Sequence, residues 1–131
     1  METTNNMLAS QRPKYLNLFR IRQPVPAVVS ILHRISGAAL FIFAWALLWL
    51  LQLTLESADG YAQAAAVAGH WLVKLFLIGM LWAFLHHFFA GLRFLLLDVH
   101  IGIDLPAARK TSWAVLALSL GLTLVLGVWL W

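Results

Sequence analysis

The chain has 131 residues, of which 63% are hydrophobic and only 11% are charged. This composition lies far from that of a soluble globular domain and predicts an integral membrane protein. The formal net charge of +4 does not indicate nucleic-acid binding, because no soluble domain remains to present the basic residues. The absence of cysteine excludes disulfides, iron–sulfur clusters and thiolate ligation of haem by this chain.

Residues 1–26 form a polar, basic segment that contains three prolines. The segment lacks the charged start and the short apolar core of a cleavable signal peptide. Glu2 is the only charged residue before Arg12, which argues against a mitochondrial presequence. We therefore expect a cytoplasmic tail, and a protein of the bacterial inner (cytoplasmic) membrane.

The first membrane span is expected at about residues 27–55, a stretch long enough to cross a hydrocarbon core of about 30 Å. Four residues at its start share one face if the span is helical: Ser30, His33, Arg34 and Gly37. Ionisable groups at the mouth of a span are expensive and usually mark a ligand, ion or redox pathway. This face is therefore a candidate site for a polar or anionic group, with Gly37 leaving room for it to approach the backbone.

The second span is expected at about residues 68–98, and one stripe of it carries His87, Gly91, Phe94 and Asp98. His87 lies on the order of 15 Å from the inner end of this helix, where an imidazole needs a partner. The glycine one turn away leaves space for a flat macrocycle, so ligation of haem iron is one interpretation. A histidine bonded to a neighbouring protein group is the other.

Three further ionisable residues lie on the second span. His86 points about 100° away from His87 around the helix, so it cannot share the ligation. Arg93 lies closer to the inner end, where it either extends to the membrane surface or pairs with a carboxylate or a haem propionate. Lys74, near the outer end, is interpreted as an interfacial anchor.

The third span is expected at about residues 112–131, twenty uncharged residues. Basic residues lie before the first span and in the loop after the second, at 109–110, whereas the loop after the first span carries Glu56 and Asp59. The positive-inside rule therefore places the N-terminus in the cytoplasm and the C-terminus outside. The sequence predicts an all-α membrane protein with one domain, residues 1–131, and three transmembrane helices. Because three such helices bury little against one another, we expect a partner subunit.

Two motifs carry a resemblance to a known family. Ser30–Gly37 reads SILHRISG, and His87–Asp98 reads HFFAGLRFLLLD, with Arg12-Pro13 and Leu16-Asn17-Leu18 upstream. In this order, with one span between them and one after them, the motifs resemble the cytochrome b large anchor subunit of succinate dehydrogenase. The resemblance covers the chain from about Arg12 to its end.

The resemblance implies a membrane anchor that pairs with a second three-helix anchor and docks an iron–sulfur subunit and a flavoprotein subunit on the cytoplasmic face. It implies one haem b, with one axial histidine from each anchor, and a site for ubiquinone. Succinate oxidation would belong to the other chains, because this one carries no dinucleotide-binding motif and no acid–base pair for a dicarboxylate.

Position by position, the resemblance makes His87 the axial ligand, and therefore the metal ligand of the haem iron. It makes Ser30 and Arg34 quinone-site residues, and it places His33 and Arg34 near the haem propionates, to which we add Arg93. The chain departs from the pattern at Phe94, where the family often has a second histidine. That departure weakens any propionate or proton role at this position, but not the axial assignment.

Two alternatives remain open from the residues alone. One is a self-contained cytochrome b in which His33 and His87 of this chain ligate one haem from opposite sides. The other is a haem-free small transporter or a structural membrane anchor. Visible absorption of the purified protein separates the haem-binding interpretations from the haem-free one.

Overall fold

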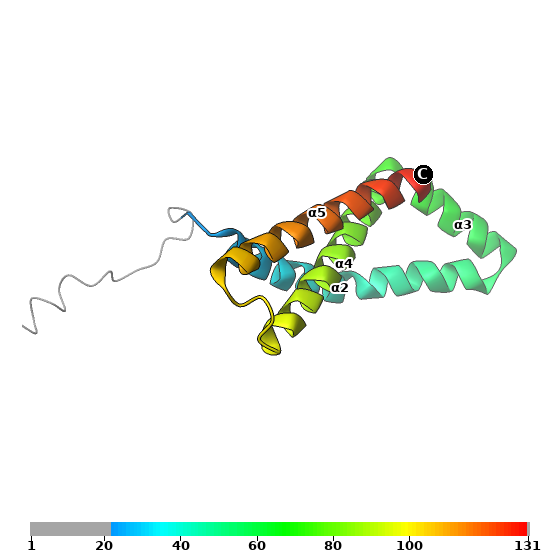
Figure 1. Cartoon of the computed structure of the whole chain (residues 1–131). Helices are drawn as coiled ribbons and strands as arrows, with labels where there is room; N and C mark the ends of the chain where they lie inside the picture. The colour runs from blue at the N-terminus through cyan, green and yellow to red at the C-terminus, as the bar shows by residue number, and fades with distance from the viewer. Residues whose placement is uncertain (1–21, 131) are drawn as a thin grey trace, which may run out of the picture.

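The computed structural model describes residues 22–130, which are entirely helical apart from short connections (Figure 1). Its helices are α2 (Val25–Glu56), α3 (Ala58–Gly69), α4 (Trp71–Asp98) and α5 (Leu105–Leu130). Helices α2, α4 and α5 are each long and apolar enough to cross a membrane. The prediction of an all-helical protein with three candidate spans is therefore confirmed. Most of the predicted cytoplasmic tail, including Arg12, lies outside the described residues.

The segment between the first two spans forms helix α3, whereas its sequence predicts a loop. Ser57 caps this helix, since its hydroxyl accepts a hydrogen bond from the Gly60 amide at 2.9 Å. Asp59 lies in the first turn, where a negative charge favours the helix, and five alanines follow within 62–68. His70 then caps α4, because its Nδ1 accepts a hydrogen bond from the Leu72 amide at 3.3 Å.

The third long helix begins at Leu105, seven residues before the predicted start at 112. Asp104 satisfies a free amide of its first turn by accepting a hydrogen bond from Ala107 N at 3.1 Å. Pro106 fits this turn because its missing N–H is not needed there. The basic residues 109–110, expected in a loop, are consequently helical.

A tight turn joins α4 to α5 and lets the two helices pack antiparallel (Figure 1). His100 adopts a positive φ of 62°, a conformation usually occupied by glycine at this position after a helix. The amides of His100 and Ile101 donate to the carbonyls of Leu97 and Leu96, at 3.0 and 2.9 Å. These bonds satisfy carbonyls at the end of α4 that have no partner within the helix.

The three long helices meet at a small apolar core of Val29 on α2, Ala90 on α4 and Val115 on α5. The buried face of α5 consists of small or short residues, Ser112, Val115, Ser119 and Thr123. Small side chains allow close approach of helices within a membrane. Their hydroxyls donate to carbonyls of α5 itself, which leaves no free O–H in this apolar setting.

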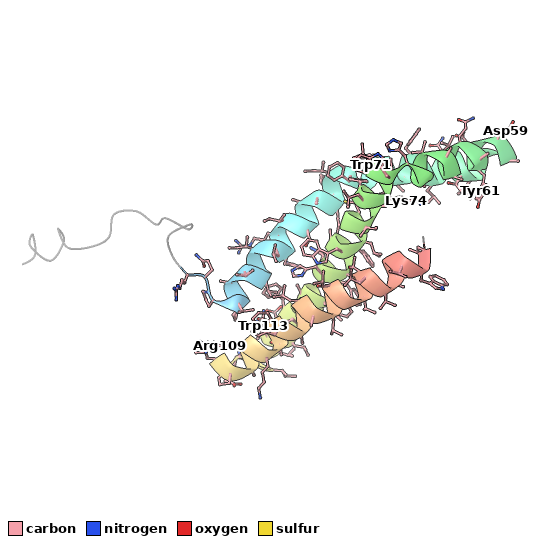
Figure 2. All side chains as sticks on the ribbon, turned by 90° about the horizontal axis from the view of Figure 1, so that it is seen from above. Asp59, Tyr61, Trp71, Lys74, Arg109 and Trp113 are labelled. Carbon is pink, nitrogen blue, oxygen red and sulfur yellow. The ribbon has the colours of Figure 1, made fainter. Side chains whose placement is uncertain are left out.

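Figure 2 shows a charged and an aromatic residue at each of the two ends of the bundle. Arg109 and Trp113 lie at the end where α2 begins, whereas Asp59 and Tyr61 lie at the opposite end, on α3. Amphipathic aromatic residues are common where a span meets the membrane surface. Which of the two ends faces the cytoplasm stays a prediction.

Candidate functional site

Helices α2 and α4 cross through two reciprocal contacts between a histidine and a glycine. A Cβ added at Gly37 would lie 2.8 Å from His87 Cε1, and one added at Gly91 would lie 3.7 Å from His33 Nε2. Between the glycines, the rings of His33 and His87 stack with their centroids 4.1 Å apart and an angle of 9° between their planes. The sequence predicts open space for a ligand beside both glycines. Within this chain, an imidazole of the other helix lies there instead.

His87 forms a hydrogen bond that fixes its protonation pattern. Its Nδ1 lies 3.0 Å from the backbone oxygen of His33. Because a carbonyl can only accept, Nδ1 carries a proton, and in the neutral ring Nε2 then has the lone pair. No hydrogen bond among residues 22–130 uses Nε2, and this atom does not belong to the buried unpartnered groups. A histidine oriented through Nδ1 and a backbone carbonyl, with Nε2 available, is the usual arrangement for binding a metal.

The His33 carbonyl also receives the Ser36 hydroxyl, at 2.9 Å. Ser36 is buried, and its oxygen lies 3.4 Å from His87 Nδ1. We do not predict a role for Ser36 from the sequence, although its spacing of three residues from His33 places it on the same side of the helix. Its burial in the helix crossing helps to hold the carbonyl that orients His87.

The stacked rings do not suit a haem held between His33 and His87. Axial ligation requires two imidazoles to approach the iron edge-on from opposite faces of the macrocycle. Here the two rings lie face to face at ordinary contact distance. His33 also lies beside Phe94, with ring centroids 5.1 Å apart and ring planes tilted by 58°. This geometry disfavours the self-contained cytochrome.

The polar residues at the start of α2 divide between two directions. His33 and Gly37 face α4, as their contacts show. Arg34 is exposed and Ser30 is half-buried, and no hydrogen bond to another described residue involves either side chain. They lie one turn apart on α2, so both are available to a ligand or a partner outside this chain.

Arg93 lies buried between α4 and α5. Its side chain is only 5% exposed. Nε donates to Thr111 Oγ1 at 3.1 Å and Nη2 donates to the Ala108 carbonyl at 3.5 Å, while the guanidinium carbon lies 5.5 Å from the centre of the Phe94 ring. Nη1 makes no hydrogen bond among the described residues and does not belong to their buried unpartnered atoms. Arg93 therefore ties α5 to α4 and keeps one donor group free.

His86 lies apart from these groups, as its position on the helix predicts. It is fully buried, and Trp82 stacks on it with ring centroids 5.3 Å apart. Within residues 22–130, no group of three or more potential metal-ligating histidines or carboxylates comes together. Any metal bound through these residues therefore needs a ligand from elsewhere, such as a macrocycle or a second chain.

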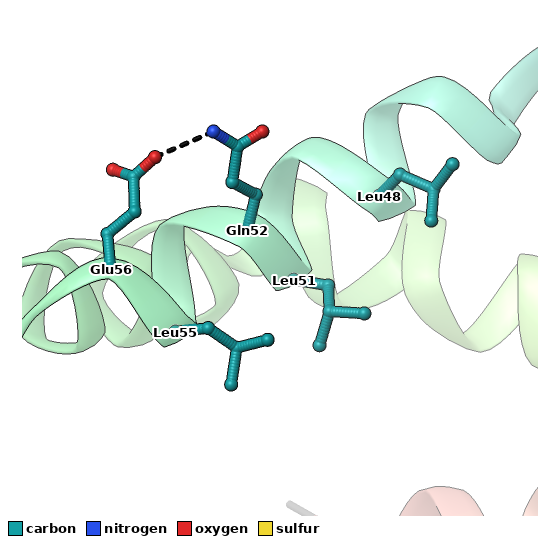
Figure 3. A pocket seen from close by; sticks show the side chains of 5 residues that line it. All are labelled: Leu48, Leu51, Gln52, Leu55 and Glu56. Atoms are coloured by element: carbon teal, nitrogen blue, oxygen red, sulfur yellow. Dashed lines mark hydrogen bonds between the residues drawn. The ribbon is translucent and has the colours of Figure 1, made fainter.

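A hollow on the C-terminal half of α2 is not part of this site (Figure 3). Its lining comes from α2 alone: Leu48, Leu51, Gln52, Leu55 and Glu56. The amide of Gln52 donates to the Glu56 carboxylate at 2.7 Å, so its polar groups satisfy each other. The candidate site is instead the α2–α4 crossing, with Ser30 and Arg34 beside it.

These features define a multi-pass helical membrane protein whose candidate site residues gather at one helix crossing. Residues 9–126 match the family described as succinate dehydrogenase/fumarate reductase transmembrane subunit. The chain belongs to this family and is a membrane-anchor subunit of the succinate dehydrogenase cytochrome b556 type. The resemblance expected from the two sequence motifs is confirmed.

The matches to similar proteins cover most of this chain. The succinate dehydrogenase cytochrome b556 subunit of Coxiella burnetii is 34% identical over 124 residues, which cover 93% of this chain and 98% of that protein. The subunit of the same name from Paracoccus denitrificans is 36% identical over 106 residues, 81% of this chain and 82% of that protein. A third, from Rickettsia felis, is 30% identical over 128 residues, 98% of this chain and all of that protein.

Proposed function

We propose that this chain binds haem b through His87 and helps to pass electrons from succinate-oxidising subunits to ubiquinone. The observation that carries the haem proposal is the hydrogen bond from His87 Nδ1 to the His33 carbonyl, which leaves Nε2 with its lone pair. The relatives are named as b-type cytochromes, in agreement with this proposal. Bound haem supplies a one-electron carrier.

A second membrane anchor would supply the other axial histidine. Among the described residues, His33 is held in the stack and His86 is buried on another side of α4, so neither is free to face His87 across a macrocycle. Bulky apolar residues on α4, such as Phe84, Phe88 and Leu92, are exposed along the same helix and offer a surface for such a partner.

We assign His33, Arg34 and Arg93 to the haem propionates. Arg34 is exposed near the crossing, and Arg93 keeps Nη1 free for a carboxylate, since only Nε and Nη2 bind α5. A guanidinium is permanently charged and can pair with a propionate through its remaining N–H groups.

Arg93→Gln is expected to shift the haem midpoint potential without abolishing haem incorporation, because a positive charge close to the haem is lost. Thr111→Val is the matched control, since it removes the hydrogen bond to Arg93 Nε but keeps the charge. Redox titration of both purified variants measures the effect. Equal shifts in the two variants would mean that Arg93 acts only as a tie between the helices.

We place ubiquinone beside Ser30 and Arg34. The two side chains lie one turn apart on α2, and no described residue takes up their hydrogen-bonding groups. Ser30 can donate to a quinone carbonyl, and Arg34 can stabilise negative charge that develops on the quinone oxygen during reduction. The isoprenoid tail would remain in lipid.

Ser30→Ala and Arg34→Leu are each expected to reduce succinate-to-quinone turnover by about 100-fold, the usual effect of removing one preorganised donor. Succinate reduction of a soluble dye by the flavoprotein subunit should stay nearly normal in the same purified complex. Arg109→Leu is the control, because Arg109 is also exposed and lies at the same end of the bundle. Loss of both activities would indicate failed assembly, and normal quinone turnover would place the site elsewhere.

We further propose that the end carrying Arg109 and Trp113 faces the cytoplasm of a bacterium, where an iron–sulfur and a flavoprotein subunit dock. The basic residues 109–110 at this end and the acidic Asp59 at the other support this orientation. Because the chain has no cysteine, the Arg109→Cys variant can be labelled selectively in this chain. Labelling from the periplasmic side of the inner membrane would contradict the orientation.

A further inference from the structure

The hydrogen bond to the His33 carbonyl holds one atom of the His87 ring but leaves the plane of the ring free to turn. It joins Nδ1 to the carbonyl oxygen at 3.0 Å, and the Ser36 hydroxyl oxygen lies 3.4 Å from the same nitrogen. A hydrogen bond keeps most of its strength while its angle at the hydrogen departs from linearity by about 30°. A second contact is therefore needed to hold the ring in one orientation.

The side chain of His33 supplies this second contact. Its ring covers one face of the His87 ring, with the centroids 4.1 Å apart and 9° between the planes. An edge of His87 lies against the backbone of α2, because a Cβ added at Gly37 would lie 2.8 Å from Cε1. Carbon atoms in contact are about 3.5–4.0 Å apart. Turning the His87 plane toward His33 would therefore bring the two rings into collision, and turning it away would lose the stack.

The ring of His33 is itself restricted by Phe94. Their ring centroids lie 5.1 Å apart, with the planes tilted by 58°. Phe94 packs against the apolar core where the three long helices meet, and the guanidinium carbon of Arg93 lies 5.5 Å from the centre of its ring. A side chain held by the core thus limits the movement of the ring that covers His87.

We propose that the side chain of His33 is a positioning residue, which sets the plane of the His87 ring and thereby the angle between the two axial imidazoles of haem b. This inference rests on the ligation by His87 proposed above. The Nε2 lone pair lies in the plane of the ring, whereas His33 covers a face, so the stack and the bond to iron use different directions. Groups that orient a metal ligand in this way tune the metal that it binds.

Stacking uses the face of the His33 ring and leaves its nitrogen atoms on the edge. No hydrogen bond among residues 22–130 involves either of these ring nitrogens, and neither belongs to the buried unpartnered atoms. The same side chain can therefore position His87 and bind a propionate. Experiments have to separate the effect of the flat ring from the effect of its nitrogens.

Electron paramagnetic resonance of the oxidised, purified complex tests the proposal, because the largest g value of low-spin ferric haem depends on the angle between its two imidazole planes. His33→Ala removes the flat ring and should shift and broaden this signal. His33→Phe keeps a flat ring over His87 but has no ring nitrogen, so it should leave the signal sharp and unshifted. An unchanged signal in His33→Ala, or the same change in both variants, would overturn the positioning role.

Phe94→Leu gives a second test that leaves His33 in place, and it decides the question if His33→Ala retains no haem. Loss of the aromatic contact should broaden the same signal, because the His33 ring gains freedom. Phe89→Leu is the matched control, since Phe89 packs against the same core and has its ring contact with Phe88 instead. Equal signals in the two variants would contradict the proposal.

His87→Leu separates this inference from the proposed ligation. Loss of the low-spin signal in His87→Leu, together with an unchanged signal in His33→Ala, would leave His87 as the ligand and remove only the role of His33. A low-spin signal with two histidine ligands that persists in His87→Leu would overturn both.

Discussion

His87→Leu is expected to yield a complex without low-spin haem bound through two histidines, because leucine offers no lone pair to the iron. His86→Leu and His100→Leu should retain the haem spectrum, since His86 is buried away from His87 and His100 lies in the exposed turn after α4. The reduced-minus-oxidised absorption difference of the purified variants measures the effect. An unchanged spectrum in His87→Leu, with haem lost in His86→Leu, would overturn the ligand assignment.

Gly37→Ala is expected to weaken haem binding by about 10- to 100-fold, the usual effect of disturbing the group that orients a metal ligand. The new Cβ would lie 2.8 Å from His87 Cε1, well inside the carbon–carbon contact distance of about 3.5–4.0 Å. The His87 ring would have to move, and its hydrogen bond to the His33 carbonyl would be distorted or broken. The loss is measured as the haem content per purified chain, determined by absorption, during dilution or competition.

Gly91→Ala provides the matched control for this substitution. Its Cβ would lie 3.7 Å from His33 Nε2, an ordinary van der Waals contact, so His33 can stay where it is. Haem binding should therefore remain close to normal in Gly91→Ala. Equal losses in the two variants would mean that any methyl group added at this crossing disturbs the site, and that contact with His87 is not the cause.

The three spans could be predicted from the sequence because length and hydropathy alone require them. Helix α3 and the early start of α5 could not be predicted in this way, since both depend on capping by Ser57 and Asp104 rather than on apolar periodicity. Capping adds a local contribution of about 1 kcal/mol, which is easily missed beside the large apolar signal of the spans.

From the sequence, the site residues could be related to one another only by their spacing within a single helix. Helical spacing placed Ser30 and Arg34 together and separated His86 from His87. The stack of His33 on His87 and the bond from Arg93 to Thr111 depend on how two helices rotate and slide against each other. No pattern within one segment contains that information, so these contacts appear only in the folded chain.

The length of α2 links the site to the membrane around it. Its 32 residues correspond to about 48 Å of helix, whereas a hydrocarbon core is about 30 Å thick. A helix longer than the hydrocarbon core extends its ends into water, kinks or tilts, and a tilt increases as the bilayer becomes thinner. Because His33 lies on α2 and its carbonyl orients His87 on α4, a change of tilt turns that acceptor relative to the ring it holds. We therefore expect haem affinity, measured in vesicles of different acyl-chain length, to change with bilayer thickness.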